Sequence, residues 1–371
     1  MQPVALTLAL ILREMKCRKR LWKKTIRKRL HGGAMAVTIH DIAKKVGVSP
    51  STVSRVINGK ATISSETKEK IFAAMEELNF HPSSLARNLA TGSSQAIALI
   101  INAEDTKSFA NQFFNRSVFG IEKIAQARGF NLIITNDNSA DGSPVEQLVY
   151  AKKADGIIIP PAIVTPKLIS RLRKLHFPFV ILGEPAISKN EVNWVDVNNA
   201  QGSELAVQHL AAQGYQSIAF IGESQDLVFM RNRVNGFRTG LEAQRLELTD
   251  GFIAECDGTH ESACQAALAL LEKNLRPDAF ICSDNAIAYG VISAVKKKGL
   301  HIPGEIGVVT FDNYPLALYM EPNLTAVDID TFLLGEQAAA ILFKSIEENG
   351  NLQQILINTR LFERESTNRK N

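Results

Sequence analysis

Seven short apolar runs between residues 96 and 310 constrain the fold of this chain more than any other feature. They have the length and the β-branched and aromatic side chains of buried strands, and amphipathic stretches of helical length separate most of them. Strands that alternate with helices form βαβ units, which build parallel sheets covered by helices on both faces. So many units predict two doubly wound α/β lobes, with ligands bound in the crevice at the carboxyl ends of the strands. The runs cover residues 96–101, 131–135, 156–159, 179–182, 217–221, 278–282 and 306–310.

A helical unit precedes this body. Thr38 and Asp41 have the spacing of a capping box, which predicts the start of a first short helix. Gly47 supplies a tight turn, after which Ser49 caps a second helix that has Pro50 at its first position. Two short helices joined by a glycine turn and followed by a third are typical of a helix-turn-helix domain, although any small three-helix bundle shares this pattern.

The outward face of the second helix favours DNA binding. Ser51, Thr52 and Arg55 point away from the expected core of this unit. Short hydroxyl side chains let a helix approach base edges, and an arginine can make a bidentate contact to guanine. The third helix is expected to bury one apolar face, made of Ile71, Phe72, Met75 and Leu78.

Charge is distributed unevenly along the chain. The net charge is +4, but residues 1–34 carry ten basic residues and one acidic residue, whereas residues 93–371 have a net charge of −7. The apolar run at residues 4–12 is less than half of the ~20 residues needed to span a bilayer, and its basic residues follow it rather than precede it. The segment is therefore a nucleic-acid arm, a membrane-surface helix or a stretch upstream of the true start, and we favour a start at Met35.

Signals for catalysis or metal binding are missing from the sequence. It contains no Walker loop, no dinucleotide-binding glycine pattern and no nucleophile elbow, and the four cysteines lack the spacing of a zinc site. We interpret the four cysteines as reduced, mostly buried thiols, which favours a location in the cytoplasm. We therefore expect no enzyme, no cofactor and no metal.

Residues 37–58, with the sequence VTIHDIAKKVGVSPSTVSRVIN, resemble the DNA-binding headpiece of the LacI/GalR repressor family. Nearly every position of a twenty-residue pattern is filled, and the resemblance continues to about residue 365 but does not cover residues 1–34. It implies an all-α helix-turn-helix headpiece followed by an α/β, two-lobed, periplasmic-binding-protein-like domain for effector binding and dimerisation. The implied divisions are a headpiece at 35–80, a hinge helix and linker at 81–93, a body at 94–371, and crossovers between the lobes near 195, 329 and 350.

The resemblance assigns DNA contacts to the headpiece and the hinge. Lys44, Lys45 and Lys60 would contact phosphates, while Leu89 matches a wedge that opens a base step in the minor groove and Ala86 would pack hinge on hinge. A plain helical linker, with the leucine at the edge of a core, is the alternative. The expected DNA-contact set is Thr38, Ser49, Pro50, Ser51, Thr52, Ser54, Arg55, Asn58, Lys60, Ala86 and Leu89.

The resemblance also implies an effector site in the body. Arg233 begins an Arg-x-x-Gly-Phe motif and Asp312 follows the last apolar run, and both match positions that hold the family's effector. Either residue alone would be interpreted as part of a surface ion pair, but together they can donate to and accept from vicinal sugar hydroxyls. Asn198 stands where the family usually has an aspartate, so it offers a hydrogen bond without charge. Further candidates, polar residues at a strand end and aromatic residues that stack on a sugar or belong to a core, are Ser283, Asp284, Phe109, Phe113, Phe114 and Trp194.

These features predict a homodimeric repressor that binds double-stranded operator DNA and is released by a small sugar effector. The segments 111–114, 149–156 and 177–183 are similar to the maltose-operon repressors of Gram-positive bacteria, so maltose or a maltodextrin is the favoured effector. A catabolite-control regulator that uses a phosphocarrier co-repressor protein is one alternative, and a sugar-binding protein without a regulatory role is another. No membrane partner is expected, and the nucleoid in the cytoplasm is the expected location.

Overall fold

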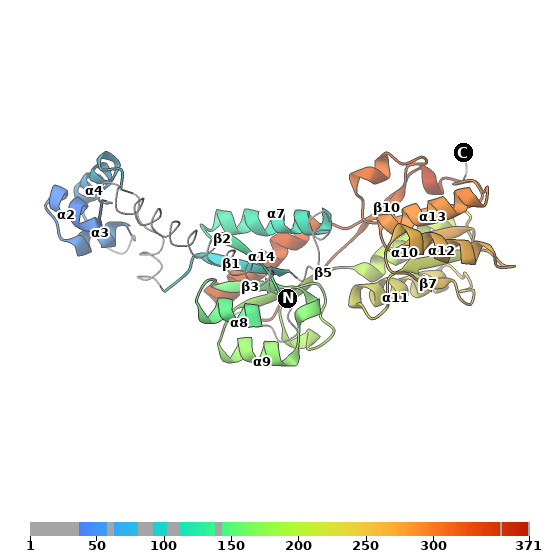
Figure 1. Ribbon diagram of the computed structural model, residues 1–371, viewed down its shortest axis with the longest axis horizontal. Helices are drawn as coiled ribbons and strands as arrows, with labels where there is room; N and C mark the ends of the chain where they lie inside the picture. Colours follow the sequence, from blue (N-terminus) through green and yellow to red (C-terminus); the bar gives the residue numbers. More distant parts are fainter. Residues whose placement is uncertain are drawn as a thin grey trace, which may run out of the picture. The chain divides into compact units, whose positions relative to one another are not determined.

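The computed structural model describes residues 37–57, 63–80, 92–101, 112–137, 143–348 and 351–369. The chain divides into two compact units at Gly92 and Ser93. The first unit contains the headpiece, and the second contains the α/β body (Figure 1).

The headpiece has the three expected helices, α2 (Ile39–Val46), α3 (Pro50–Ile57) and α4 (Ser65–Glu77). Gly47 ends α2 with φ 76°, a left-handed conformation that costs glycine little. Ile42, Val53 and Ile71, one from each helix, are fully buried and form the centre of the core.

Phe72 was expected in the core of the headpiece, and this expectation is wrong. It is 52% exposed, and Ala74 is buried in its place. The reason is helical periodicity: residues three and four after Ile71 share its face, whereas the next residue along is rotated by about 100° away from it.

The first lobe of the body contains a six-stranded parallel sheet in the order β11-β5-β4-β3-β1-β2. Helices α7 and α14 pack on one face through Ile121 and Leu334, and α8 and α9 pack on the other through Val145 and Leu168 (Figure 1). Covering both faces explains why the central strands β1, β3 and β4 are continuous apolar runs. The elements are β1 (Ala96–Ile101), β2 (Asn131–Asn136), β3 (Gly156–Ile159), β4 (Phe179–Leu182), β5 (Trp194–Val197), β11 (Gln354–Ile357), α7 (Gln112–Ala127), α8 (Ser143–Tyr150), α9 (Pro166–Lys174) and α14 (Thr331–Glu347).

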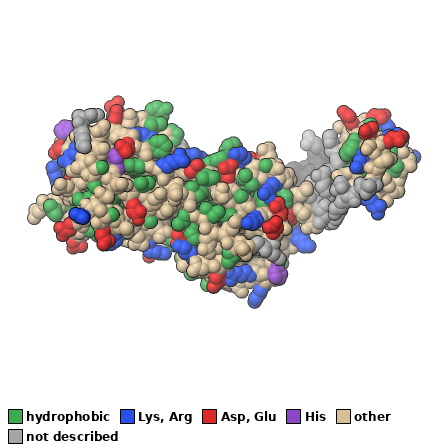
Figure 2. Space-filling model, turned by 180° about the vertical axis from the view of Figure 1, so that it is seen from behind, with side chains coloured by type: hydrophobic (Ala, Val, Ile, Leu, Met, Phe, Trp, Pro, Cys, Tyr) green, Lys and Arg blue, Asp and Glu red, His purple; other side chains and the backbone are tan. Residues whose placement is uncertain are grey.

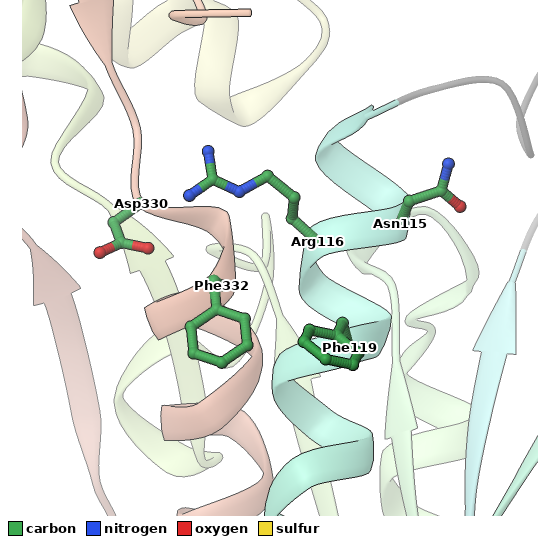
Figure 3. A pocket seen from close by; sticks show the side chains of 5 residues that line it. All are labelled: Asn115, Arg116, Phe119, Asp330 and Phe332. Carbon is green, nitrogen blue, oxygen red and sulfur yellow. The ribbon is translucent and has the colours of Figure 1, made fainter.

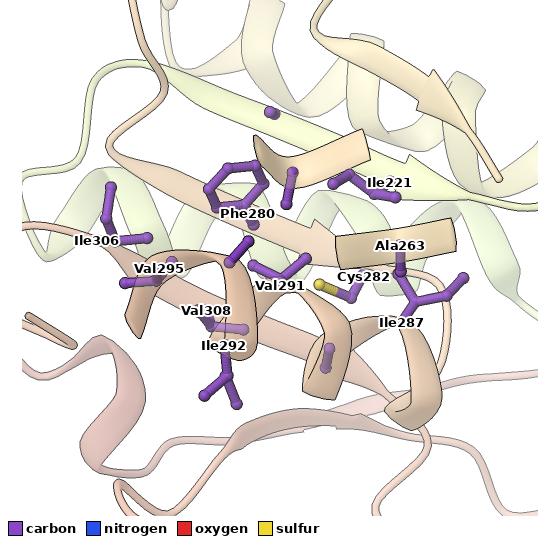
Figure 4. Packing of buried hydrophobic residues seen from close by; sticks show 14 of the residues in the cluster. Ile221, Ala263, Phe280, Cys282, Ile287, Val291, Ile292, Val295, Ile306 and Val308 are labelled. Atoms are coloured by element: carbon purple, nitrogen blue, oxygen red, sulfur yellow. The ribbon is translucent and has the colours of Figure 1, made fainter. Parts of the chain in front are cut away.

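The second lobe repeats this architecture with the strand order β12-β10-β9-β8-β6-β7, in which β12 is antiparallel to β10. Helices α12 and α13 cover one face, where Phe280 and Val291 are fully buried (Figure 4), and α10 and α11 cover the other. The elements are β6 (Ile218–Gly222), β7 (Ile253–Glu255), β8 (Ala279–Cys282), β9 (Gly307–Phe311), β10 (Thr325–Asp328), β12 (Arg360–Phe362), α10 (Asn199–Ala212), α11 (Val228–Ala243), α12 (His260–Leu271) and α13 (Asn285–Lys297).

The chain passes between the two sheets at three places. Asn198 links β5 to α10, and residues 329–330 link β10 to α14, close to the expected positions. The third connection lies at residues 358–359, so the expected position near 350 is wrong. The physical reason is that β11 must first pair with β5 at the edge of the first sheet before the chain crosses to β12.

Glycines permit close packing of helices, and Gly236 and Gly335 are two examples. A Cβ atom on Gly236 of α11 would lie 2.1 Å from the backbone oxygen of Ala200 in α10, and one on Gly335 of α14 would lie 2.1 Å from that of Ser117 in α7. Gly236 belongs to the Arg-x-x-Gly-Phe motif. Its lack of a side chain lets α11 approach α10 closely enough to place Arg233 at the end of the sheet.

Acidic and basic side chains are interspersed over the face of the body that Figure 2 shows. Among the described residues, no helix has both the length and the apolar character that a membrane span requires.

Candidate functional site

The outward face of α3 presents a small group of hydroxyls at the start of the helix. The Ser49 Oγ accepts a hydrogen bond from the Thr52 N–H at 3.1 Å, and it lies 2.7 Å from the Ser51 Oγ and 2.8 Å from the Thr52 Oγ1. Ser51 and Arg55 are exposed, whereas Pro50, Thr52 and Ser54 are half-buried. The hydroxyl of Ser49 therefore caps the helix, and Ser51 and Arg55 are the more available side chains for another molecule.

Two further headpiece candidates are already engaged within the headpiece. The Thr38 N–H and hydroxyl both donate to the Asp41 carboxylate, at 2.8 and 2.7 Å, and these bonds lower the pKa of Asp41. Lys45 forms an ion pair with Glu77 of α4. Lys44 is exposed on α2 and is the better candidate for a phosphate contact.

Several predicted DNA contacts lie outside the described residues. These are Asn58, Lys60, Ala86 and Leu89, and in the body Phe109 and the side chain of Phe113 also lie outside.

Polar side chains gather in the body where parallel strands end. Such ends share one edge of a sheet, so consecutive strands deliver side chains to the same crevice. In the first lobe these are Glu184 after β4 and Asp196 near the end of β5. The second lobe contributes Glu223 after β6, Ser283 and Asp284 after β8, and Asp312 after β9.

Arg233 of α11 is the centre of this group. It is only 5% exposed, and its guanidinium carbon lies 4.0 Å from the centroid of the Phe311 ring. Its Nε donates to the Asn199 Oδ1 at 2.9 Å, and its Nη1 donates to the Ser283 backbone oxygen at 2.5 Å. Burial lowers the pKa of this guanidinium, while nearby carboxylates act in the opposite direction.

Asp312 sits in a strained turn beside this arginine. Its φ is 68°, a left-handed conformation that few non-glycine residues adopt, and the Asn285 side-chain amide holds the turn by donating to the backbone oxygens of Phe311 and Asp312 at 3.0 and 2.7 Å. Burial raises the pKa of the Asp312 carboxyl to about 6, although the positive charge of Arg233 acts to lower it.

Two buried oxygens in this group have no hydrogen-bond partner among the described residues. They are the Asp312 Oδ1, on a residue that is 9% exposed, and the Ser283 Oγ, on a residue that is 2% exposed. Leaving a buried acceptor unpaired costs about 1–3 kcal/mol, so such atoms are expected where a ligand completes the bonding.

Asp196 is a second buried carboxyl near Arg233. It is 6% exposed and accepts from the backbone N–H of Glu184 at 3.0 Å and of Val197 at 2.8 Å. Burial raises its pKa to about 6, and those two hydrogen bonds and Arg233 oppose the rise.

A direct hydrogen bond joins the two lobes at this crevice. The Asn232 Nδ2 on α11 donates to the Glu184 Oε2 at 3.1 Å, and the Lys189 Nζ donates to the other oxygen of the same carboxylate at 2.6 Å. Glu184 therefore connects a cation of its own lobe with an amide of the other lobe.

Trp194 is a correction to the expected site. It is 2% exposed in the core beneath α8 and α9, and its indole N–H donates to the Lys189 backbone oxygen at 2.9 Å. Trp194 is the first residue of β5. The first residues of parallel strands lie at the edge of the sheet opposite to the one where ligands bind.

Two other candidates have structural contacts. The Asn198 Oδ1 caps α10 by accepting from the Gln201 N–H at 3.2 Å. Phe114 is half-buried and packs against the core between the first sheet, α7 and α14.

Five polar residues at the strand ends of the crevice were missed from the sequence: Asn199, Asn285, Asp196, Glu184 and Glu223. Each lies at the end of a strand or at the start of the following helix. A systematic search for polar residues at those positions would have found them.

A separate hollow of 460 Å³ lies where α7 meets the beginning of α14. Phe119 and Phe332 face each other there, with ring centroids 5.8 Å apart, and Arg116 extends toward the side where Asp330 lies (Figure 3). Asp330 also caps α14 by accepting from the Leu333 N–H at 2.9 Å. No group of acids, histidines or cysteines with the arrangement of a metal site occurs in the described part of the chain.

Comparisons with known families match both units. Residues 38–83 match the model of bacterial regulatory proteins of the lacI family, and residues 207–367 match a periplasmic binding protein-like domain. Both the headpiece and the two-lobed body expected from the sequence are thereby confirmed.

Individual relatives are similar over most of their length. The chain is 33% identical to the transcriptional regulator MalR of Streptococcus pneumoniae over 325 residues, which are 86% of this chain and 96% of that protein. It is 31% identical to catabolite control protein A of Priestia megaterium over 313 residues, 84% of this chain and 92% of that protein. Among solved structures, the lac repressor dimer bound to operator and an anti-inducer superposes with a TM-score of 0.76 at 25% identity, covering 89% of this chain and 99% of that one.

Proposed function

Because the chain belongs to the LacI family of bacterial regulatory proteins, we propose that it represses a carbohydrate-utilisation operon and is released from its operator by a sugar. The observation that carries this proposal is the buried cluster of Arg233, Asp312 and Ser283 at the ends of parallel strands, where two oxygens lack partners. The relatives are transcriptional regulators, so the function is regulation rather than catalysis.

Operator recognition is assigned to α3. Its exposed Arg55 and Ser51 would reach base edges in the major groove, and Lys44 would contact phosphate. Two headpieces of a homodimer would occupy successive half-sites of a near-palindromic operator, with Leu89 of the hinge acting in the minor groove between them and Ala86 packing hinge on hinge. The superposition on an operator-bound dimer supports this arrangement.

Sugar recognition is assigned to the crevice. A hydroxyl of the sugar would donate to the unpaired Asp312 Oδ1, and another would bond with the Ser283 Oγ. Arg233 would donate to a sugar oxygen from its place over the Phe311 ring. We also predict that Asp284, Asn198 and Phe114 contact the sugar.

Release from the operator would depend on the relative angle of the two lobes, which are joined by three chain connections. A ligand that contacts both lobes stabilises one relative angle of the lobes over another, so it shifts the population between two states. The state with bound sugar would separate the paired hinges and lower operator affinity. We place this regulator in the cytoplasm, on the nucleoid.

Maltose or a maltodextrin is the proposed effector. The similarity to MalR and the three segments at 111–114, 149–156 and 177–183 support it. The similarity to catabolite control protein A supports a second candidate, a regulator whose operator affinity is raised by a phosphocarrier co-repressor protein.

A thermal-shift screen of mono- and oligosaccharides, followed by gel mobility shift with operator DNA, distinguishes these candidates. Maltose should raise the melting temperature of the full chain and release the DNA. A chain that binds no sugar, yet binds DNA more tightly when a phosphocarrier protein is added, would favour the second candidate.

A further inference from the structure

The charge balance of the crevice indicates which chemical class of ligand it accepts. Four carboxyls, Asp196, Glu223, Asp284 and Asp312, are close enough for their charges to act on Arg233. The fifth, Glu184, lies next to Asp196, and its backbone N–H donates to the Asp196 carboxylate at 3.0 Å.

The cations that face these carboxyls, Arg233 and Lys189, already donate to groups of the protein. Arg233 donates to Asn199 and to the Ser283 backbone oxygen, and it is buried over an aromatic ring. Lys189 is paired with Glu184 at 2.6 Å. Among the described residues at these strand ends, the carboxyls thus outnumber the cations, so the net charge of these groups is negative when the carboxyls are ionised.

The unpaired atoms require a hydroxyl as their partner. When its carboxyl is ionised, the Asp312 Oδ1 can accept a hydrogen bond but cannot donate one. The Ser283 Oγ can do both. A sugar hydroxyl satisfies both atoms. A phosphate or a carboxylate oxygen has no proton to give to Asp312, and its charge would face several carboxylates of the same sign at low dielectric.

We propose that this crevice selects uncharged polyhydroxylic ligands and rejects their phosphate esters and acids. The inference rests on the proposed function, in which this crevice binds the effector. It means that the regulator senses a free sugar rather than a phosphorylated metabolite of that sugar.

Paired ligands test the selection on the full chain. Isothermal titration calorimetry compares maltose, glucose and ribose with maltose 6′-phosphate, glucose 6-phosphate and ribose 5-phosphate, and glucose also with gluconate. We expect at least one neutral sugar to bind, and each anion to bind at least tenfold more weakly than its neutral counterpart. An anion that binds as tightly as its neutral counterpart overturns the selection while leaving sugar regulation intact. If no compound of either class binds, both the selection and the proposed sugar effector fail.

Charge-neutralising variants test the cause of the selection. Asp284→Asn and Glu223→Gln are combined, since asparagine retains the ability to cap α13. The control is Glu242→Gln, an exposed glutamate at the other end of α11. In the double variant the ratio of anion to neutral affinity should rise by roughly tenfold, and in the control it should not change. An unchanged ratio in a folded double variant contradicts the charge argument; should that variant not fold, the wild-type comparison still decides the proposal.

Discussion

The Asp312 carboxyl provides a test in which stability and function should change in opposite directions. Substituting Asp312→Asn keeps the shape of the side chain and its ability to accept a hydrogen bond, and asparagine tolerates the φ of 68° well. The change removes a buried charge that has an unpaired oxygen. We therefore expect the variant to be more stable than the wild type near neutral pH.

The size of this effect follows from the pKa. The pKa of Asp312 rises from 3.8 to about 6. At 1.36 kcal/mol per pKa unit, ionisation of this carboxyl therefore lowers the free energy of unfolding by about 3 kcal/mol. Between about pH 4 and pH 6 the folded state binds more protons than the unfolded state, so the stability contributed by this group falls as the pH rises. The gain from asparagine should be complete above about pH 7 and should disappear below about pH 4.

Thermal unfolding of the full chain, followed by circular dichroism at several pH values, measures this difference. For a body of this size, about 3 kcal/mol corresponds to roughly 5 °C in melting temperature. The same variant should bind the effector about tenfold more weakly, because a neutral acceptor replaces a charged one. A variant that is less stable than the wild type at pH 7.5, or whose gain persists at pH 4, would refute the assignment of a costly buried carboxylate.

Three further predictions concern the headpiece and the hinge. Ile71→Ala should lower the stability of the headpiece by about 2–4 kcal/mol and abolish DNA binding at 25 °C, whereas Phe72→Ala, at a half-exposed position, should change that stability by less than about 1 kcal/mol. Chemical denaturation compares the two variants, and equal losses would contradict the core described above. Arg55→Ala should cost about 1–3 kcal/mol of operator affinity and relax specificity at one base pair, which binding to single-substitution operators measures; a uniform loss at all positions would instead indicate a phosphate contact. Leu89→Ala should weaken specific binding more than non-specific binding in the same titrations, and equal weakening would argue against a minor-groove wedge.

The sequence predicted the fold where its patterns are strong. All seven apolar runs became strands. Six of them are buried strands covered on both faces, which need continuous apolar side chains, and the seventh forms the partly exposed edge strand β2. The strands that were missed lack this signal. β5 contains a buried aspartate, and β12 is a three-residue edge strand with two exposed residues, so neither has the composition of a buried strand. The third crossover was misplaced for the same reason, since β11 alternates in exposure and was not recognised as part of the first sheet.

The candidate site was predictable only in part. Arg233 and Asp312 stand in recognisable motifs, and the structure brings both into one buried cluster. The position of Asn199 at a helix start is visible in the sequence, but its pairing with the arginine is not, because that pairing depends on contact between α10 and α11. Trp194 was misassigned because the sequence does not reveal which end of a short strand an aromatic residue occupies.

The most direct test of the central claim measures DNA release by a sugar. The full chain is used to select a duplex from a random pool, and fluorescence anisotropy then follows binding to that duplex while neutral sugars are added. We predict tight, near-palindromic duplex binding that maltose or another neutral sugar weakens at least tenfold, and a response that Asp312→Asn shifts to higher sugar concentration. Binding to DNA that no neutral sugar changes, or no selection of a specific duplex at all, would contradict the account.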